Sequence, residues 1–422
     1  MLAKTLRYFR DRKADAVVIS GDLSDWGLAS GFRLLMETWN GVFPNDRAPG
    51  GRKVQRLFCT GNHDYEGCFS DEMLAGMRAA GYDESDSLFT LGMKKCWEEI
   101  FQEEFDLVRR RDVNGYAFVS GEWHREGKIE GFNRTPAWLA KHGSELDSRF
   151  PFFYFQHPPV GATVVPGNGE PDPRTEALSR FPNAVVLTGH THATLNSGTS
   201  IWQGDFTAVS VPSLSYTSTP RGYENGYEKR NGTSTRSMPM LQTRRDLEEA
   251  QGFFVSVYPE EMVFERRDFA QGEEAGEAWI VPLGADAGRP FSFESHSSRV
   301  PVPQFPRNAW LEVGFSNTDN RRGFWQVTLE FRFPNASAEP RARAFDYEVR
   351  IVRADGGEPV VKRFLSPAFH KLQRDEPSEM RFWMDAADLP KGVPYRVEVY
   401  PRNSFGVVGN PLVSEEMRPV AS

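Results

Sequence analysis

Four short apolar runs, each followed directly by polar side chains that can bind metal ions, constrain the fold of this chain more than any other feature. The runs begin at Ala16, Leu57, Phe152 and Ala184 and lead into the segments GDLSD, TGNHD, QHPP and TGHTH. Runs of this length and composition are typical of parallel strands buried on both faces. Because open α/β sheets gather their ligand sites at the carboxyl ends of the strands, we expect the four polar segments to meet at one metal centre.

Carboxylate, amide and imidazole side chains are concentrated in these polar segments, namely Asp22, Asn62, His63, Asp64, His157, His190 and His192. This mixture of oxygen and nitrogen donors suits divalent Zn, Mn or Fe rather than a thiolate site. His190 and His192 are two residues apart, so that on a strand both rings would lie on one face. We expect the histidines outside these segments to be ordinary core or surface residues.

The distribution of apolar residues predicts two domains. Residues 1 to about 210 alternate apolar runs with charged, helical segments, including a helical region over 71–111, which favours an α/β domain with outer helices. From about residue 302 onward, short alternating strands separated by turn signals favour a β-sandwich. We therefore expect an α/β domain over residues 1–285, a linker over 286–301 and an all-β domain over 302–422.

Charge and composition exclude several classes of protein. The 50 basic and 58 acidic residues are spread along the 422-residue chain and give a net charge of −8, without a basic stripe for nucleic acid. Three cysteines do not make a disulfide framework. No apolar stretch reaches the ~18 residues that a transmembrane helix needs. The N-terminal residues lack the apolar core of a signal peptide, and nothing in the sequence indicates an oligomeric state.

The segments ISGDLSD, TGNHD, QHPP and TGHTH, in this order, resemble the motif series of the calcineurin-like metallophosphoesterases. The resemblance covers about residues 14–211. A GD motif alone is a weak match, whereas GNHD followed by GHTH, with a strand-end histidine between them, is specific. The resemblance implies a four-layer α/β/β/α sandwich. It also implies metal-dependent hydrolysis of a small-molecule phosphodiester or phosphomonoester by attack of a metal-bound hydroxide.

The same resemblance implies metal ligands. Asp22 would bridge two divalent ions. The second ion would be completed by Asn62, His157 and His190, while His192 would bind the first ion. Two cations about 3.5–4 Å apart can activate water and hold both the attacking and the leaving oxygen of a displacement.

Two residues receive catalytic roles from the resemblance. His63 would protonate the leaving oxygen or stabilise the phosphoryl charge, and Asp25 would hold the other ring nitrogen of His63. Such a carboxylate fixes the tautomer and orientation of an imidazole. Asp64 could serve the same purpose or cap its own loop. Substrate selection is expected from residues 66–112 and 217–240, which carry no recognisable motif.

The chain departs from the family at its beginning. The family series opens with a D-x-H segment that gives an Asp and a His to the first metal, yet no histidine precedes Asp22. We expect a chain that starts downstream of its natural N-terminus and lacks the first strand. It would then hold one of the family's two Mn, Fe or Zn ions, or bind metal weakly, with impaired activity. An alternative is a non-catalytic binding or structural relative with a degraded metal site.

The last strands suggest an accessory domain. The segment YRVEVYPRNSFGVVGNP resembles the final hairpin of a fibronectin type III or immunoglobulin-like domain. Such domains imply an extracytoplasmic enzyme, so that the native product would be secreted or periplasmic although this chain shows no signal peptide. The region could also only stabilise the catalytic domain, or carry a function of its own such as carbohydrate or surface adhesion.

Overall fold

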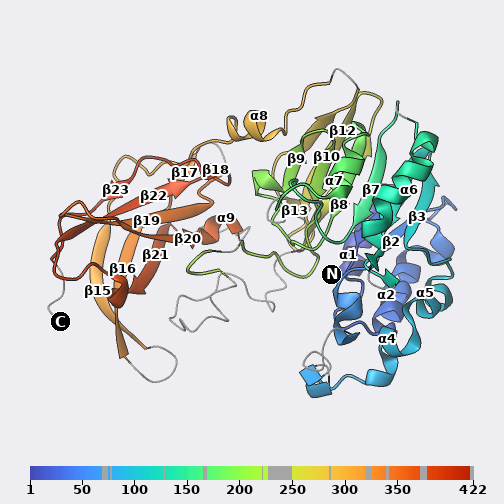
Figure 1. The fold of residues 1–422 in the computed structure, drawn as a ribbon, viewed down its shortest axis with the longest axis horizontal. Helices are drawn as coiled ribbons and strands as arrows, with labels where there is room; N and C mark the ends of the chain where they lie inside the picture. The colour runs from blue at the N-terminus through green and yellow to red at the C-terminus, as the bar shows by residue number, and fades with distance from the viewer. Residues whose placement is uncertain are drawn as a thin grey trace. The chain divides into compact units, whose positions relative to one another are not determined.

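The computed structural model describes residues 1–68, 75–76, 78–126, 129–147, 149–164, 169–220, 222–226, 250–284, 287–319, 325–338, 342–370 and 378–418. The chain forms two compact units (Figure 1). Unit 1 comprises Met1–His192, Ser200–Ser215 and Ala250–Phe293, and unit 2 comprises Ala193–Thr199, Tyr216–Glu249 and Glu294–Ser422. The domain boundaries expected from the sequence stay a prediction. Within the described residues, no helix has the length and apolar character that crossing a membrane requires.

Unit 1 contains a pair of strands whose ends lead to Asp22 and Asn62. β1 (Ala16–Ser20) pairs in parallel with β2 (Gln55–Cys59), and the last residues of the two strands lie opposite each other. Because the strands run in the same direction, the chain leaves both of them at the same edge. The parallel pairing confirms what the first two apolar runs predict.

The third and fourth apolar runs form the centre of a six-stranded sheet with the order β3-β4-β7-β8-β10-β9. β7 (Phe152–Gln156) and β8 (Ala184–Thr188) are parallel neighbours and are buried along their whole length, which explains why their sequences lack polar alternation. The remaining strands are β3 (Val108–Val113), β4 (Tyr116–Gly121), β9 (Ile201–Gln203) and β10 (Thr207–Ser210). Only the two edge strands, β3 and β9, run antiparallel to their neighbours.

Further strands cover one face of this sheet. They are β11 (Gln251–Val257), β12 (Glu261–Asp268), β13 (Glu273–Glu274) and β14 (Trp279–Pro282). A single apolar cluster joins Leu57 of β2 and Phe264 of β12 to Phe155 of β7 and Leu187 of β8. The sheet strands of unit 1 therefore form two layers that face each other through this core.

Helices cover the outer faces of both layers. α6 (Thr135–His142) and α7 (Pro173–Leu178) pack on the six-stranded sheet through an apolar cluster of their own. α1 (Leu2–Asp11), α2 (Ala29–Val42) and α5 (Met93–Phe101) share a cluster with β1 and β2. Figure 1 shows α2 and α5 together on one side of unit 1 and α6 and α7 beside β7 and β8. These contacts confirm the predicted four-layer α/β/β/α order.

The helical region predicted over 71–111 is only partly helical. α5 ends before Gln102, whose backbone is left-handed with a φ of 55°. The chain then forms β3, which pairs antiparallel with β4. Its three consecutive arginines hide the alternation of a strand, so the sequence suggested a continued helix instead. Residues 71–74 and 77 of this region, and 221 and 227–240 of the expected loop over 217–240, lie outside the described residues.

Unit 2 is an antiparallel β-sandwich. One sheet contains β15 (Glu312–Asp319), β16 (Trp325–Pro334) and β21 (Glu379–Asp385). The other contains β20 (Val360–Leu365), β19 (Asp346–Arg353), β22 (Tyr395–Arg402) and β23 (Leu412–Val413). Apolar side chains of both sheets share one core cluster. The all-β prediction for the C-terminal region is therefore confirmed, while its fibronectin or immunoglobulin type stays a prediction.

Several short elements complete the chain. They are α4 (Leu88–Leu91), β5 (Arg125–Glu126), β6 (Ile129–Glu130), α8 (Phe293–Ser297), β17 (Ser337–Ala338), β18 (Ala342–Arg343) and α9 (Pro367–His370). A 3-10 helix over His63–Cys68 follows β2 and begins at the predicted site.

Candidate metal centre

The backbone after β1 is folded so that Asp22 faces the ends of other strands. Gly21 and Asp22 both have positive φ angles, 93° and 54°. A Cβ on Gly21 would lie 2.5 Å from Nδ1 of His157, so glycine is required there for space as well as for conformation. A left-handed aspartate is strained, and such strain is typical of sites where the surroundings fix a functional side chain. His192 is left-handed too, with a φ of 47°.

Four of the predicted metal ligands meet at one point. Oδ1 of Asn62 lies 3.0 Å from Nε2 of His157 and 2.9 Å from Nδ1 of His190. Nε2 of His157 lies 3.1 Å from Oδ2 of Asp22 and 3.2 Å from Nδ1 of His190. We call Asp22, Asn62, His157 and His190 the acceptor cluster. Asp22 follows β1 and Asn62 follows β2, while His157 follows β7 and His190 follows β8, as the strand-end argument predicts.

Hydrogen bonding shows that the acceptor cluster fits a cation. Nδ1 of His157 lies 2.7 Å from the carbonyl oxygen of Ser20, which can only accept, so Nδ1 carries the hydrogen. In a neutral ring Nε2 then presents its lone pair to the oxygens of Asp22 and Asn62. Three electron pairs facing one another repel unless a positive charge, either a proton on Nε2 or a metal ion, lies between them. The donor set of a carboxylate, an amide oxygen and two imidazoles therefore suits a divalent metal ion.

The amide of Asn62 is essential to this arrangement, because it contacts both imidazole rings. Among the described residues, His, Cys, Asp and Glu side chains do not by themselves form a group of three or more that could hold a metal. Binding of a metal ion would thus depend on the side-chain amide oxygen of Asn62. Such an oxygen ligand favours harder cations over the softer metals that bind cysteine thiolates.

The protonation states agree with metal binding. Burial raises the pKa of Asp22, but the charge and hydrogen bond that His157 supplies when both its ring nitrogens are protonated, together with the charge of His63, outweigh burial and lower the pKa to about 2. The ring of His190 has an exposed outer side, yet partial removal from water and the charge of His157 lower its pKa to about 4. Partial burial lowers the pKa of His192 to about 4 as well. At neutral pH these side chains are in the forms that bind cations.

His63 lies beside the acceptor cluster and contacts both aspartates of GDLSD. Its backbone N–H donates to Oδ1 of Asp22 at 3.0 Å. Its Nδ1 lies 3.0 Å from the backbone carbonyl oxygen of Asp25 and 3.5 Å from the Asp25 carboxylate, whose side chain is 75% exposed. The closer partner of the ring is therefore the carbonyl, although the sequence comparison assigned that contact to the carboxylate.

His192 lies near these residues on the loop after β8. Its backbone N–H donates to the carbonyl of Gly189 at 3.2 Å. The charges of Asp22, His157, His190 and His63 act on its ring. Its role as a ligand stays a prediction.

Asp64 connects two loops of the site. It is fully buried, and its carboxylate accepts from the backbone N–H of Ser24 and of Gly61, each at 2.8 Å. Burial and the charge of Asp22 raise its pKa to about 7. These contacts join the loop after β1 to the loop after β2, which favours the loop-holding alternative over contact with His63.

A buried network that the sequence did not reveal supports the loop of Asn62. Glu122 is fully buried and accepts from the backbone N–H of Thr60 at 2.8 Å and from Nη2 of Arg109 at 2.8 Å. The hydroxyl oxygen of Thr60 accepts in turn from the backbone N–H of Trp123 at 2.9 Å. The Trp123 ring lies 5.9 Å from that of His190. The one feature of the sequence that could have indicated this network is the position of a charged residue, Glu122, directly after the apolar strand β4.

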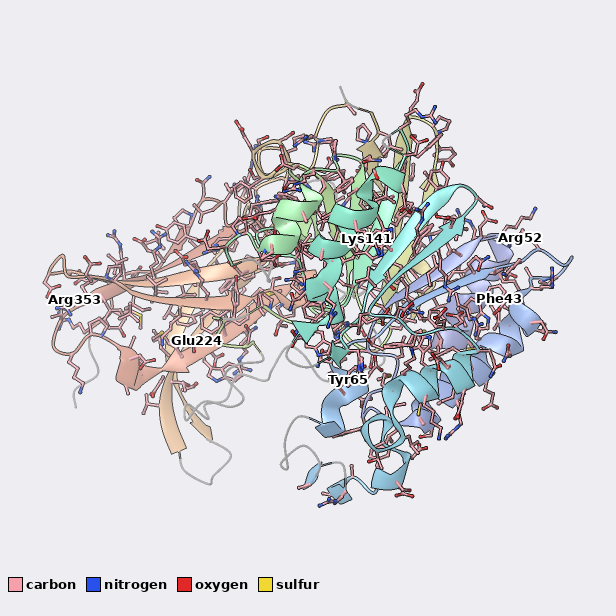
Figure 2. The ribbon with its side chains drawn as sticks, turned by 45° about the vertical axis from the view of Figure 1, so that its right-hand side comes forward. Phe43, Arg52, Tyr65, Lys141, Glu224 and Arg353 are labelled. Carbon is pink, nitrogen blue, oxygen red and sulfur yellow. The ribbon has the colours of Figure 1, made fainter. Side chains whose placement is uncertain are left out.

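His124 is a partly buried histidine that makes a hydrogen bond and a stacking contact, as expected of an ordinary structural residue. Its Nδ1 lies 2.8 Å from the hydroxyl of Tyr65, and the two rings stack at 5.6 Å. Tyr65, labelled in Figure 2, follows His63 by two residues. Together these side chains form a polar and aromatic border beside the site.

Comparison with known proteins agrees with this geometry. No curated protein matches the chain. A family model described as calcineurin-like phosphoesterase matches residues 1–194, a range that includes every candidate ligand from Asp22 to His192. Members of this family are generally metal-dependent, hydrolytic phosphoesterases. Residues 1–194 are thus similar to the calcineurin-like phosphoesterase family.

Proposed function

We propose that unit 1 hydrolyses a small-molecule phosphate ester, either a diester or a monoester, at a centre where the acceptor cluster holds one divalent cation. The convergence of three electron pairs from His157, Asp22 and Asn62 is the observation that supports this most directly. Mn, Fe and Zn suit this set of donors. A cation bound there supplies stabilisation of the phosphoryl charge and lowers the pKa of water.

The chain itself prepares Asp22 for this role. One carboxylate oxygen, Oδ1, is held by the backbone N–H of His63, so that Oδ2 is turned toward His157. The low pKa keeps the carboxylate ionised throughout the physiological range. The strained backbone holds this orientation without further movement, which reduces the reorganisation needed when a substrate binds.

We propose His63 as the residue that transfers a proton to the leaving oxygen. Because its Nδ1 is directed at the carbonyl of Asp25, Nε2 is the ring atom through which His63 would exchange that proton. The Asp25 carboxylate lies 3.5 Å from the same ring nitrogen. Asp25 would thus act on His63 through both its carbonyl and its carboxylate.

We propose His192 as a ligand of a second divalent cation that shares Asp22. Among the described residues, these two are the candidates for that cation, so we expect it to bind more weakly than the first. This observation also supports a second candidate function, a non-catalytic relative that binds one metal and a phosphate group without turning over an ester. Activity measurements separate the two functions.

The test is hydrolysis of bis(p-nitrophenyl) phosphate and p-nitrophenyl phosphate by the full chain in the presence of Mn²⁺. Exchanging a metal ligand should cost more than the ~10- to 100-fold effect of an outer partner, so we expect His190→Gln to lower kcat/KM at least about 100-fold. His142→Gln is the matched control, since His142 contacts Glu145 on the surface of α6.

Metal content is measured on the same samples. We expect one tightly bound Mn²⁺ in the native chain and the His142 variant, and less in the His190 variant. Tight metal binding without hydrolysis of either ester would favour the non-catalytic function. Equal activity of the two variants would contradict the proposed centre.

A further inference from the structure

Trp26 lies between two residues whose backbones approach the segment of His63, the residue proposed to protonate the leaving group. Its preceding neighbour, Asp25, contacts the ring of His63 through its carbonyl at 3.0 Å. Its following neighbour, Gly27, packs so closely that a Cβ there would lie 2.7 Å from the carbonyl of Asp64 and 3.3 Å from that of His63. Both chain neighbours of Trp26 therefore fix its backbone against the 3-10 helix that begins at His63.

The ring of Trp26 forms an aromatic pair with Tyr82. The two ring centroids are 5.7 Å apart, and the ring planes are inclined by 36°. Tyr82 is 42% exposed and Trp26 is partly exposed, so the pair lies at the surface and not in the core. Tyr82 belongs to the 66–112 region from which substrate selection is expected.

The segment that carries the tyrosine is fastened to the segment that carries the tryptophan. The backbone N–H of Leu88 donates to the carbonyl of Gly27 at 2.8 Å. Asp86 accepts from the backbone N–H of Ser30 at 2.8 Å and pairs with Arg33 at 3.0 Å. These contacts hold both ring-bearing segments of the aromatic pair in place before any ligand binds, which reduces the entropic cost of stacking.

We propose that Trp26 and Tyr82 hold a flat aromatic ring on the leaving-group side of the substrate. The inference rests on the proposed phosphoesterase function, which places the leaving oxygen at His63. A planar π-system gains offset stacking on tryptophan or tyrosine, whereas a saturated ring of the same size does not. Two kinds of ester carry such a ring, an aryl ester and a nucleotide, and the test separates them.

The test measures binding to the full chain in Mn²⁺ by calorimetry, with two pairs of ligands. Phenylphosphonate is compared with cyclohexylphosphonate, and adenosine 5′-monophosphate with ribose 5-phosphate. Since stacking is worth ~1–3 kcal/mol per base, or about tenfold per 1.4 kcal/mol, we expect about tenfold tighter binding of the aromatic member of one pair. A preference within the first pair identifies an aryl group, and one within the second identifies a nucleobase.

Two variants assign the preference to the aromatic pair. Trp26→Leu and Tyr82→Leu should each reduce it to within about twofold, because one stacking surface is removed. Tyr82 is exposed, so its variant tests the inference even if Trp26→Leu fails to fold. Trp138→Leu is the control: Trp138 packs against His142 on α6, and Figure 2 shows Lys141 of that helix well apart from Tyr65.

The outcomes distinguish this inference from the proposed function. Equal binding within both ligand pairs, no binding of any of the four, or a preference that persists in both variants overturns the inference. A native chain that prefers the aromatic ligands but hydrolyses neither p-nitrophenyl ester would contradict the proposed function alone. Hydrolysis without an aromatic preference would contradict the inference alone.

Discussion

Each unit contains a compact group of polar side chains, but the two groups balance their charges in opposite ways. In unit 1, the atoms of the acceptor cluster direct electron pairs toward one another, with Nε2 of His157 only 3.0 Å from the amide oxygen of Asn62. In unit 2, a carboxylate cluster of Asp346 and Glu348 lies on β19 and is surrounded by donors. The first arrangement calls for a cation from outside the chain, and the second does not.

The donors of unit 2 come from β19 itself, from its neighbours β20 and β22, and from Tyr223. Glu348 accepts from Arg350 at 2.8 Å, from Arg363 at 3.0 Å and from Arg402 at 2.8 Å. Asp346 is fully buried, pairs with Arg402 at 3.1 Å and accepts from the hydroxyl of Tyr223 at 2.7 Å. Each carboxylate thus faces positive charge within the chain, although Oδ1 of Asp346 meets Arg402 as an ion pair without a hydrogen bond.

The comparison shows how polar clusters of similar composition can differ in purpose. A group whose donors and acceptors are matched stabilises the fold or is neutral to it. A group of facing acceptors reduces the stability of the metal-free protein, and this cost is characteristic of functional sites. Substitutions that remove one member should therefore have opposite effects on stability in the two units.

The largest expected effect is that of Asn62→Leu. The leucine removes the oxygen that joins both imidazoles, so we expect kcat/KM for bis(p-nitrophenyl) phosphate to fall by roughly 10³-fold and Mn²⁺ affinity to fall with it. Because one facing acceptor is gone, the melting temperature of the metal-free protein should stay the same or rise. Calorimetric Mn²⁺ titration and thermal unfolding in a chelator check both parts.

Asn133→Leu is the matched control for that variant. Asn133 is exposed and donates to Glu130 at 3.0 Å, so its loss should change neither Mn²⁺ affinity nor activity. A clear drop in the melting temperature of the metal-free Asn62 variant would contradict the argument that its amide oxygen faces other acceptors.

Glu348→Leu should have the opposite signature. It removes the carboxylate that three arginines share. The pair with Arg402 is buried, with the two side chains 13% and 7% exposed, and breaking a buried pair typically costs about 3 kcal/mol or more of unfolding free energy. The pairs with Arg350 and Arg363, which are 37% and 47% exposed, should add little. Mn²⁺ affinity should not change, because the acceptor cluster belongs to unit 1. Denaturant unfolding of the full chain measures the loss.

The control for this second variant is Glu312→Leu. Glu312 pairs with Arg332, but its side chain is 63% exposed. Exposed pairs contribute little, so we expect a change of no more than about 1 kcal/mol. Equal effects of the two glutamate substitutions would show that the carboxylate cluster contributes no more than a surface ion pair.

The acceptor cluster could be predicted from sequence because its residues follow recognisable strands. Apolar runs such as that of β8 have no polar alternation, which marks buried parallel strands, and parallel strands end at a shared edge. Local sequence then places Asn62 and His190 at that edge. The carbonyl of Asp25 as the nearer partner of His63 could not be predicted, since the backbone conformation after Asp22 decides it.

Other features depend on contacts between residues far apart in the chain. Glu122 supports Thr60 from 62 positions away, and no motif links the two. Tyr82 meets Trp26 only because separate hydrogen bonds fasten their segments together. The carboxylate cluster was missed for the same reason, because charged residues at alternate positions of a strand ordinarily indicate a solvent-exposed face. Tertiary pairing, and not local pattern, decides each of these cases.

The smallest expected effect is a pH dependence that comes from Asp346. Burial, partly offset by the charge of Arg402 and the hydrogen bond from Tyr223, raises the pKa of Asp346 from 3.8 to about 6. The folded protein therefore binds this proton more tightly than the unfolded chain does. The resulting stabilisation is fully present below pH 3.8 and is lost as the pH rises to about 6.

Asp346→Asn removes the titration of this carboxyl group. The difference in unfolding free energy between variant and native protein should therefore shift in favour of the variant, by on the order of 1 kcal/mol, from pH 4 to pH 7. Denaturant unfolding at a series of pH values measures this shift. A difference that stays constant, or that moves in favour of the native protein as the pH rises, would mean that the arginines of unit 2 compensate Asp346 completely, and the contrast with the acceptor cluster would then be sharper still.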